Sequence, residues 1–120
     1  MNEIDAGALD GFVAEAEGPV VMLNLLRFQP DGGRERYQQY IAKLGEGVRQ
    51  RYGLEVLYMG DGGRALIAEE GQSWDAVALV RYPNRAAFVS MSRDPEYREA
   101  AHLRAAALVE SVLQPTIPVR

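Results

Sequence analysis

The sequence predicts an α+β fold in which helices pack against one antiparallel sheet, and three observations support this. Apolar residues recur with helical spacing in some segments and form short runs rich in branched residues in others. The chain has 120 residues, the size of one domain. Hydrophobic residues make up 48% of it, as in an ordinary globular protein. We therefore expect one domain over residues 1–120, with residues 1–18 as an N-terminal helical extension.

The beginning of the chain is expected to form a helix and then a strand. Residues 5–16 fit a short helix that ends at Gly18-Pro19. Residues 20–28 are a run of mostly apolar, branched residues and predict a buried strand. The turn-forming residues 29–33 end that strand.

A long helix is predicted next, because a continuous apolar stripe runs through this segment. Its members are Tyr37, Tyr40, Ile41, Leu44, Val48 and Tyr52. Gly45 and Gly47 each weaken a helix by about 1 kcal/mol relative to alanine. Gly53 is suited to the position just after the last turn.

Three strands are predicted in the middle of the chain. Residues 54–59 form the first, and the glycine-rich turn 60–63 connects it to a second at 64–68. A third strand covers residues 75–82. Pro83 ends it, because proline cannot donate to the ladder of a sheet.

Two helices and a last extended segment complete the prediction. Asn84 is a good N-cap for a helix over 85–91. Asp94-Pro95 places an N-cap before a proline at the first helical position, which predicts a helix over 95–109. Residues 111–119 are extended, and their two prolines restrict them to a sheet edge or a chain crossing.

This order becomes strand–helix–strand–strand–helix–strand when strand 64–68 is treated as an inserted hairpin strand and the two late helices are joined. That is the split arrangement of a ferredoxin-like domain with an antiparallel sheet. The strands carry apolar residues on both faces, whereas the helices suffice for only one. An open apolar face is rare in soluble monomers, so we expect a homodimer that covers it.

Composition excludes several function classes. The net charge of −4 argues against nucleic-acid binding. The chain has no cysteine and one histidine, and its carboxylates are scattered, so we expect no metal site and no cofactor. The longest apolar run is too short for a membrane helix, and the N-terminus does not resemble a signal peptide. We expect a cytoplasmic protein that does not bind membranes.

A set of residues links the chain to a known superfamily. The set comprises Tyr40, Tyr52-Gly53, Gly63-Arg64, Trp74, Tyr82-Pro83, Asp94-Pro95-Glu96-Tyr97 and Arg104. Over residues 20–115 the chain resembles small proteins of unknown function in the dimeric α/β-barrel superfamily. The resemblance implies a ferredoxin-like fold, a dimeric barrel and a pocket between sheet and helices. Relatives include cofactor-free monooxygenases, lactone isomerases, haem-dependent enzymes and members with no known activity, so the resemblance selects no reaction.

Arg104 is the most informative candidate for a binding residue, because it lies within the apolar arc of the last helix. The arc contains Tyr97, Ala100, Ala101, Leu103, Ala107 and Leu108. A charge in such a place is either paired or faces a polar cavity. Arg104 is therefore a candidate for a pocket or dimer-seam role; the alternative is a structural ion pair or a side chain that reaches an edge.

Three further residues are candidate ligand-binding groups. Asn24 interrupts an apolar strand, and its amide is expected to bind either a ligand oxygen or neighbouring backbone. Tyr82 is expected to point toward the core, with Arg81 on the dimer-facing side. Tyr58 shares a predicted face with neighbouring apolar residues, so its phenol either enters the same cavity or is an ordinary core tyrosine. His102 lies on the polar face of its helix and is not expected to be catalytic.

Two functions remain open on this reading. In the first, the pocket binds a small aromatic or enolisable acid and catalyses cofactor-free proton transfer or oxidation. Arg104 and Asn24 would then hold the developing anion, and a tyrosine would move the proton. In the alternative, the protein is a non-catalytic small-molecule-binding or accessory dimer module.

Overall fold

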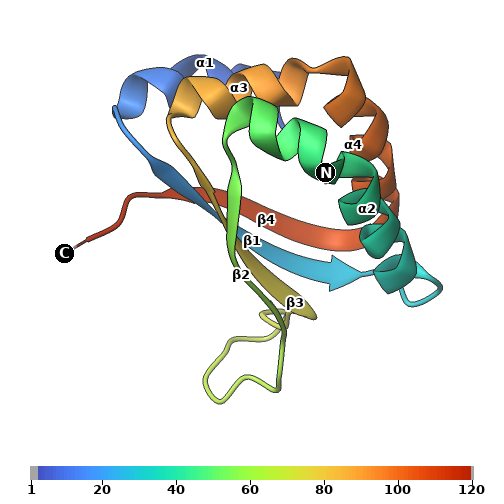
Figure 1. The fold of residues 1–120 in the computed structure, drawn as a ribbon. Coiled ribbons are helices and arrows are strands. Elements are labelled where there is room, and N and C mark those ends of the chain that lie inside the picture. Colours follow the sequence, from blue (N-terminus) through green and yellow to red (C-terminus); the bar gives the residue numbers. More distant parts are fainter. Residues whose placement is uncertain (1–2, 120) are drawn as a thin grey trace.

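The computed structural model describes residues 3–119, which form one antiparallel sheet with helices against one of its faces (Figure 1). The elements are α1 (Ala6–Glu15), β1 (Val20–Phe28), α2 (Gly33–Tyr52), β2 (Glu55–Asp61), β3 (Ala76–Tyr82), α3 (Arg85–Arg93), α4 (Pro95–Ala107) and β4 (Leu108–Thr116). The predicted α+β, ferredoxin-like fold is confirmed. None of the helices in residues 3–119 has both the length and the apolar character needed to cross a membrane.

The strand order is β2-β3-β1-β4, so β1 and β3 are central. All neighbouring strands are antiparallel, and Asn24 of β1 lies opposite Ala78 of β3 and Leu113 of β4. The last extended segment therefore forms an edge strand, as its prolines predict. This register places Asn24 in the middle of the sheet.

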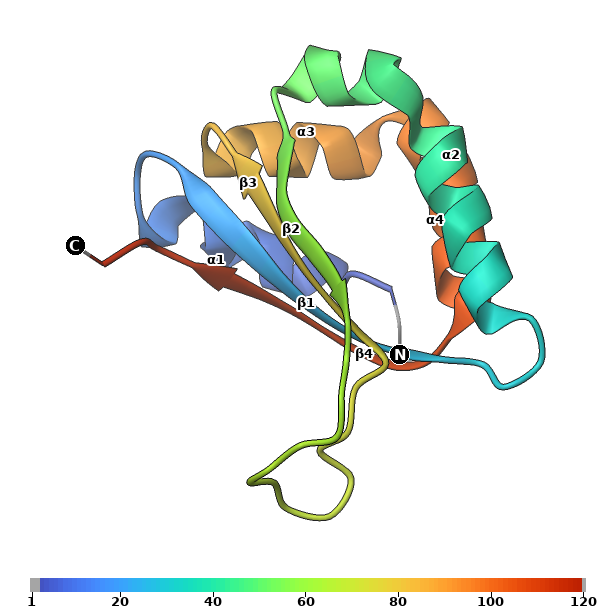
Figure 2. The same ribbon diagram turned by 60° about the horizontal axis from the view of Figure 1, so that its bottom comes forward.

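The predicted inserted strand at 64–68 is wrong. β2 ends at Asp61 and β3 begins at Ala76, and the residues between them form an irregular arm, which projects from the sheet in Figures 1 and 2. Leu66 and Ile67 in this arm are 99% and 97% exposed. Branched residues favour strands only where a partner strand and a buried face are present, and the arm has neither in this structure.

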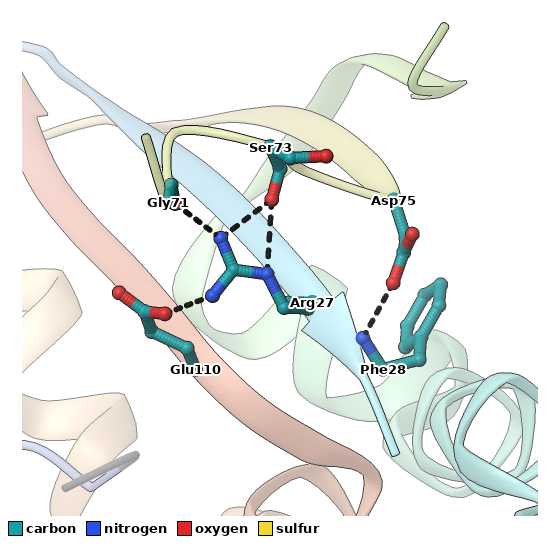
Figure 3. A network of polar contacts seen from close by, with 6 residues as sticks. All are labelled: Arg27, Phe28, Gly71, Ser73, Asp75 and Glu110. Carbon is teal, nitrogen blue, oxygen red and sulfur yellow. Dashed lines mark hydrogen bonds and ion pairs between the residues drawn. The ribbon is translucent and has the colours of Figure 1, made fainter. Parts of the chain in front are cut away.

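The arm, which we define as residues 62–75, is fastened at its base to β1 and β4 (Figure 3). The Arg27 guanidinium donates to the backbone oxygens of Gly71 and Ser73 and pairs with Glu110 of β4. It also lies 4.7 Å from the centre of the Trp74 ring. The Arg27 side chain is 25% exposed, so these contacts cover most of it.

The helix caps predicted from the sequence are confirmed. The Asn84 side chain accepts a hydrogen bond from the Ala87 N–H at 2.7 Å, and Asp94 accepts one from the Glu96 N–H at 2.8 Å. Asp94 also accepts from the Tyr52 hydroxyl and pairs with Arg51 at 2.7 Å. This cluster ties the end of α2 to the start of α4.

Helix α1 is anchored to α3 through a buried arginine. Arg85 is 5% exposed, lies 4.6 Å from the centre of the Phe12 ring, and donates to the Phe12 backbone oxygen at 3.2 Å. The rings of Phe12 and Phe88 meet edge to face at 5.5 Å. These contacts hold α1 on the same side of the sheet as the other helices.

The two faces of the sheet differ in what covers them. On the helix side, Val20 and Leu26 of β1 are fully buried in the core. On the other side, Leu23 of β1 lies opposite Leu79 of β3, and both are only partly buried. In Figure 2 no described helix lies over that second face, which we call the open face.

Candidate functional site

A cavity of about 620 Å³ lies between the helix side of the sheet and the helices. This volume falls within the range typical of small-molecule sites. Its floor is formed by side chains of β1, β2 and β3, and its roof by α2, α3 and α4. Apolar residues form most of the wall, so the few polar groups in it determine which ligands it can hold.

Arg104 and Asn24 are the central polar pair of this cavity. Both line it and both are buried, with exposed fractions of 8% and 7%. The Nη2 of Arg104 donates to the Oδ1 of Asn24 at 3.2 Å, and the Nδ2 of Asn24 donates to the Met22 backbone oxygen at 3.4 Å. Asn24 thus bonds to backbone and orients Arg104 at the same time, while Arg104 forms part of the cavity wall.

Four tyrosines surround this pair. They are Tyr37 and Tyr40 of α2, Tyr82 of β3 and Tyr97 of α4, and all four line the cavity and are buried. The rings of Tyr37 and Tyr40 are 5.3 Å apart, and Tyr37 also contacts the Phe28 ring at 5.7 Å. An aromatic wall of this kind packs well against a planar ligand.

Burial keeps the tyrosine protons in place. Desolvation raises the pKa of Tyr37, Tyr40 and Tyr82, and the positive charge of Arg104 opposes that rise at each of them. All three phenols are therefore protonated near neutral pH and act as hydrogen-bond donors rather than as bases.

Tyr82 lies where the sequence predicts it. It is buried on the helix side, and its hydroxyl contacts the Sδ of Met91 at 3.7 Å. Its neighbour Arg81 lies on the open face and pairs with Glu55 at 3.4 Å. The expected core-side position of Tyr82 is thus confirmed. Its contact with a ligand stays a prediction.

The structure does not bring Tyr58 into the cavity. A bulge in β2 pairs Val56 with Val80 but Tyr58 with Leu79, so the bulge turns Tyr58 to the open face. The Tyr58 side chain is 55% exposed in the chain and folds over Gly60, where an added Cβ would lie 2.2 Å from the phenol oxygen. Strict alternation places Tyr58 with Val56, and only the bulge separates them.

Sequence reasoning missed Tyr37 and the contribution of α1. Tyr37 was expected only as a member of the apolar stripe of the long helix. The signal that could have found it is the presence of two tyrosines in that stripe together with an arginine in the apolar arc of another helix. Ile4 and Leu9, before and within α1, line the mouth of the cavity. His102 also lines it and is exposed, so it lies at the rim rather than beside Arg104.

The described residues do not provide a set of side chains that could hold a metal ion. Across residues 3–119, no group of three or more histidine, aspartate or glutamate side chains is placed to hold a metal ion. The groups around Arg104 are phenols, an amide and apolar side chains. They suit an organic anion better than a cation.

An antiparallel sheet with helices on one face and a cavity between the two layers defines a ferredoxin-like α+β protein with an internal ligand cavity. Residues 32–114 match the family described as a domain of unknown function, DUF1330. The chain belongs to this family. No match is found among curated proteins.

Solved structures support the same assignment. RPA0582, a protein of unknown function from Rhodopseudomonas palustris, is 37% identical, with 99% of this chain and 97% of that chain covered and a TM-score of 0.88. A dimeric ferredoxin-like protein of unknown function from Jannaschia sp. CCS1 is 14% identical (84% and 100% covered, TM-score 0.64). The hydroxynitrile lyase of Passiflora edulis is 16% identical (84% and 94% covered, TM-score 0.65). The last two likenesses concern the fold alone.

Proposed function

We propose that this protein binds a small, mostly apolar organic acid in the cavity and catalyses a cofactor-free proton transfer on it. The observation that carries the proposal is the buried Arg104 guanidinium, which forms part of the wall of a mostly apolar cavity of about 620 Å³. A buried cation next to open volume favours an anionic ligand there, since a bound anion offsets part of the cost of burying the charge.

The geometry favours proton transfer over oxidation. When a C–H bond next to a carbonyl breaks, its electron pair forms the enolate double bond and negative charge develops on the carbonyl oxygen. Arg104 and the protonated tyrosines are donors that stabilise such an oxygen. The released proton passes to a water molecule in the cavity and returns to carbon or oxygen in the product. A protein of similar fold from Passiflora edulis is described as a hydroxynitrile lyase, so this fold can hold an active site.

We also propose that the functional unit is a homodimer formed through the open face. Leu23 and Leu79 are partly buried there and no described helix covers them. The edge strand β2 exposes an apolar side chain as well, Leu57, which is 49% exposed. The Jannaschia protein with the same fold is described as dimeric. Light scattering at micromolar concentration should give twice the chain mass for the wild-type protein. For Leu79→Glu the measured mass should fall to that of a single chain. Ser90→Glu, on the exposed surface of α3, is the matched control.

Two probes that differ in charge test the binding part of the proposal. The acid 3-phenylpropionate and its neutral amide have the same ring and chain. We expect the acid to bind measurably and the amide at least about tenfold more weakly, the scale of one charged hydrogen bond. Equal binding of the two by calorimetry would exclude anion recognition by Arg104.

A second assay separates the enzyme from the alternative, a non-catalytic binding module. In D2O, the methylene protons of phenylpyruvate exchange through its enol, and proton NMR follows their loss. We expect the protein to accelerate this exchange above the buffer rate in proportion to its concentration. Binding of 3-phenylpropionate without any acceleration would favour the non-catalytic module.

A further inference from the structure

The polar groups at the floor of the cavity have separate tasks. The amide oxygen of Asn24 accepts from Arg104 at 3.2 Å, and its amide nitrogen donates to the Met22 oxygen at 3.4 Å. Asn24 is therefore a positioning residue, because its described bonds orient the guanidinium. The ligand is therefore expected to contact Arg104 and a phenol of the same wall.

That phenol belongs to Tyr37. Tyr37 and Arg104 are both buried in the wall of the same cavity. Burial raises the pKa of Tyr37, and the charge of Arg104 and a hydrogen bond from it oppose that rise. A guanidinium can only donate, so the Tyr37 oxygen accepts this bond and its own hydrogen remains able to donate to another oxygen. The Tyr37 ring packs against the rings of Phe28 and Tyr40, at centroid distances of 5.7 Å and 5.3 Å. Tyr37 is thus a fixed donor adjacent to a fixed cation.

Two adjacent donors of this kind match a ligand with oxygens on neighbouring carbons. The planar fork of an arginine suits a carboxylate, and one phenol hydrogen suits the carbonyl next to it. A simple carboxylic acid has no oxygen in that second position. It would leave the Tyr37 hydrogen facing apolar ligand atoms in a desolvated cavity, which weakens binding.

We propose, resting on the function proposed above, that Tyr37 and Arg104 together select 2-oxo acids over simple carboxylic acids. Arg104 binds the carboxylate, and Tyr37 donates to the neighbouring keto oxygen. The apolar and aromatic wall takes the aryl or alkyl substituent. Tyr37 is the specificity-determining residue of the cavity, and the same hydrogen bond strengthens when that keto oxygen becomes an enolate.

A matched pair of acids tests this proposal. Phenylpyruvate and 3-phenylpropionate share ring, chain length and carboxylate, and they differ at the carbon next to the carboxylate, where only phenylpyruvate has a keto oxygen. By calorimetry at neutral pH, we expect the wild-type protein to bind phenylpyruvate about tenfold more tightly, the scale of one hydrogen bond in a buried site. Tyr37→Phe should weaken the binding of phenylpyruvate by that factor and leave the affinity for 3-phenylpropionate unchanged. Tyr58→Phe removes a hydroxyl on the open face, outside the cavity, and it should keep the preference.

The outcomes distinguish a failure of the proposed role of Tyr37 from a failure of the proposed acid-binding function. Equal affinities of the wild-type protein for the two acids would overturn the role of Tyr37 and leave the proposed acid-binding function intact. A tenfold preference that survives in Tyr37→Phe would likewise overturn that role. Failure of both acids to bind wild-type protein would overturn the proposed function and this inference with it. Urea unfolding of Tyr37→Phe checks that a lost preference does not reflect a lost fold.

Discussion

The Nη2 of Arg104 on α4 lies 3.2 Å from the Oδ1 of Asn24 on β1, and this bond joins the helix layer to the middle of the sheet inside the cavity. The two residues are far apart in the chain, and each interrupts an apolar pattern. An apolar pair at these positions would fill the core without any need for partners. Their presence in one cavity is the structural basis of the proposed function.

Two glycines of α2 should respond oppositely to replacement by alanine. Gly45 has φ 62° and ψ 175° and forms a kink inside the helix. A residue with a side chain can adopt this conformation only with strain. Gly47 is helical, and an added Cβ there meets only the end of Arg51 at 4.0 Å. We expect Gly45→Ala to destabilise the protein by about 1–3 kcal/mol. Gly47→Ala should stabilise it by about 0.5–1 kcal/mol.

Urea midpoints measure both changes. Equal stabilisation by the two substitutions would show that α2 is straight and that Gly45 is an ordinary helical glycine. That result would restore the prediction from sequence, in which the two glycines have the same effect.

Helix starts and strands were predictable from the sequence because local chemistry determines them. Asn84 and Asp94 bond the backbone of the turns they precede, and no distant residue is needed for that. Arg104 was predictable as a site candidate because a charge within an apolar arc is conspicuous. Each of these signals is local.

The predictions failed where contacts between distant segments of the chain determine the structure. The arm contains a strand-like run but has no partner strand, and pairing is not visible in a single segment. Tyr58 turned to the open face because one extra residue in β2 reverses the alternation after Val56. Tyr37 was not predicted as a site residue, because its interaction with Arg104 joins two helices and cannot be seen in either helix alone.

The arm should loosen when its anchor is removed. Arg27 holds the oxygens of Gly71 and Ser73 and stacks on Trp74, so Arg27→Met deletes several contacts at once. We expect faster hydrogen exchange and faster proteolysis within residues 62–75, with little change in the central strands. Arg64→Met, within the exposed arm, is the control. Unchanged exchange in the arm of Arg27→Met would show that other contacts position it.

Acid should weaken the junction between α2 and α4. The Tyr52 hydroxyl, then the Arg51 guanidinium and the Glu96 N–H, lower the pKa of Asp94 to about 2 in the folded chain. Because the folded pKa lies below the unfolded value, the carboxylate stabilises the fold above about pH 4. This contribution is lost as the pH falls toward 2.

Urea midpoints at pH 7, 4 and 2.5 test this dependence. Asp94→Asn should lower the midpoint at pH 7 and approach the wild-type value at pH 2.5, where the wild-type side chain begins to protonate. Asp10→Asn, on the exposed face of α1, should follow the wild-type protein throughout. A constant difference between Asp94→Asn and wild type across this range would contradict the role of the ionised carboxylate.

The central claim is that Arg104 anchors an anionic ligand, and Arg104→Met tests it most directly. Methionine keeps an unbranched apolar side chain and removes the charge and the donors. Calorimetry with 3-phenylpropionate should show binding weakened by about 1.5–3 kcal/mol, the scale of a charged hydrogen bond, in a protein whose urea unfolding remains cooperative. Wild-type affinity for 3-phenylpropionate in a well-folded Arg104→Met protein would contradict the account.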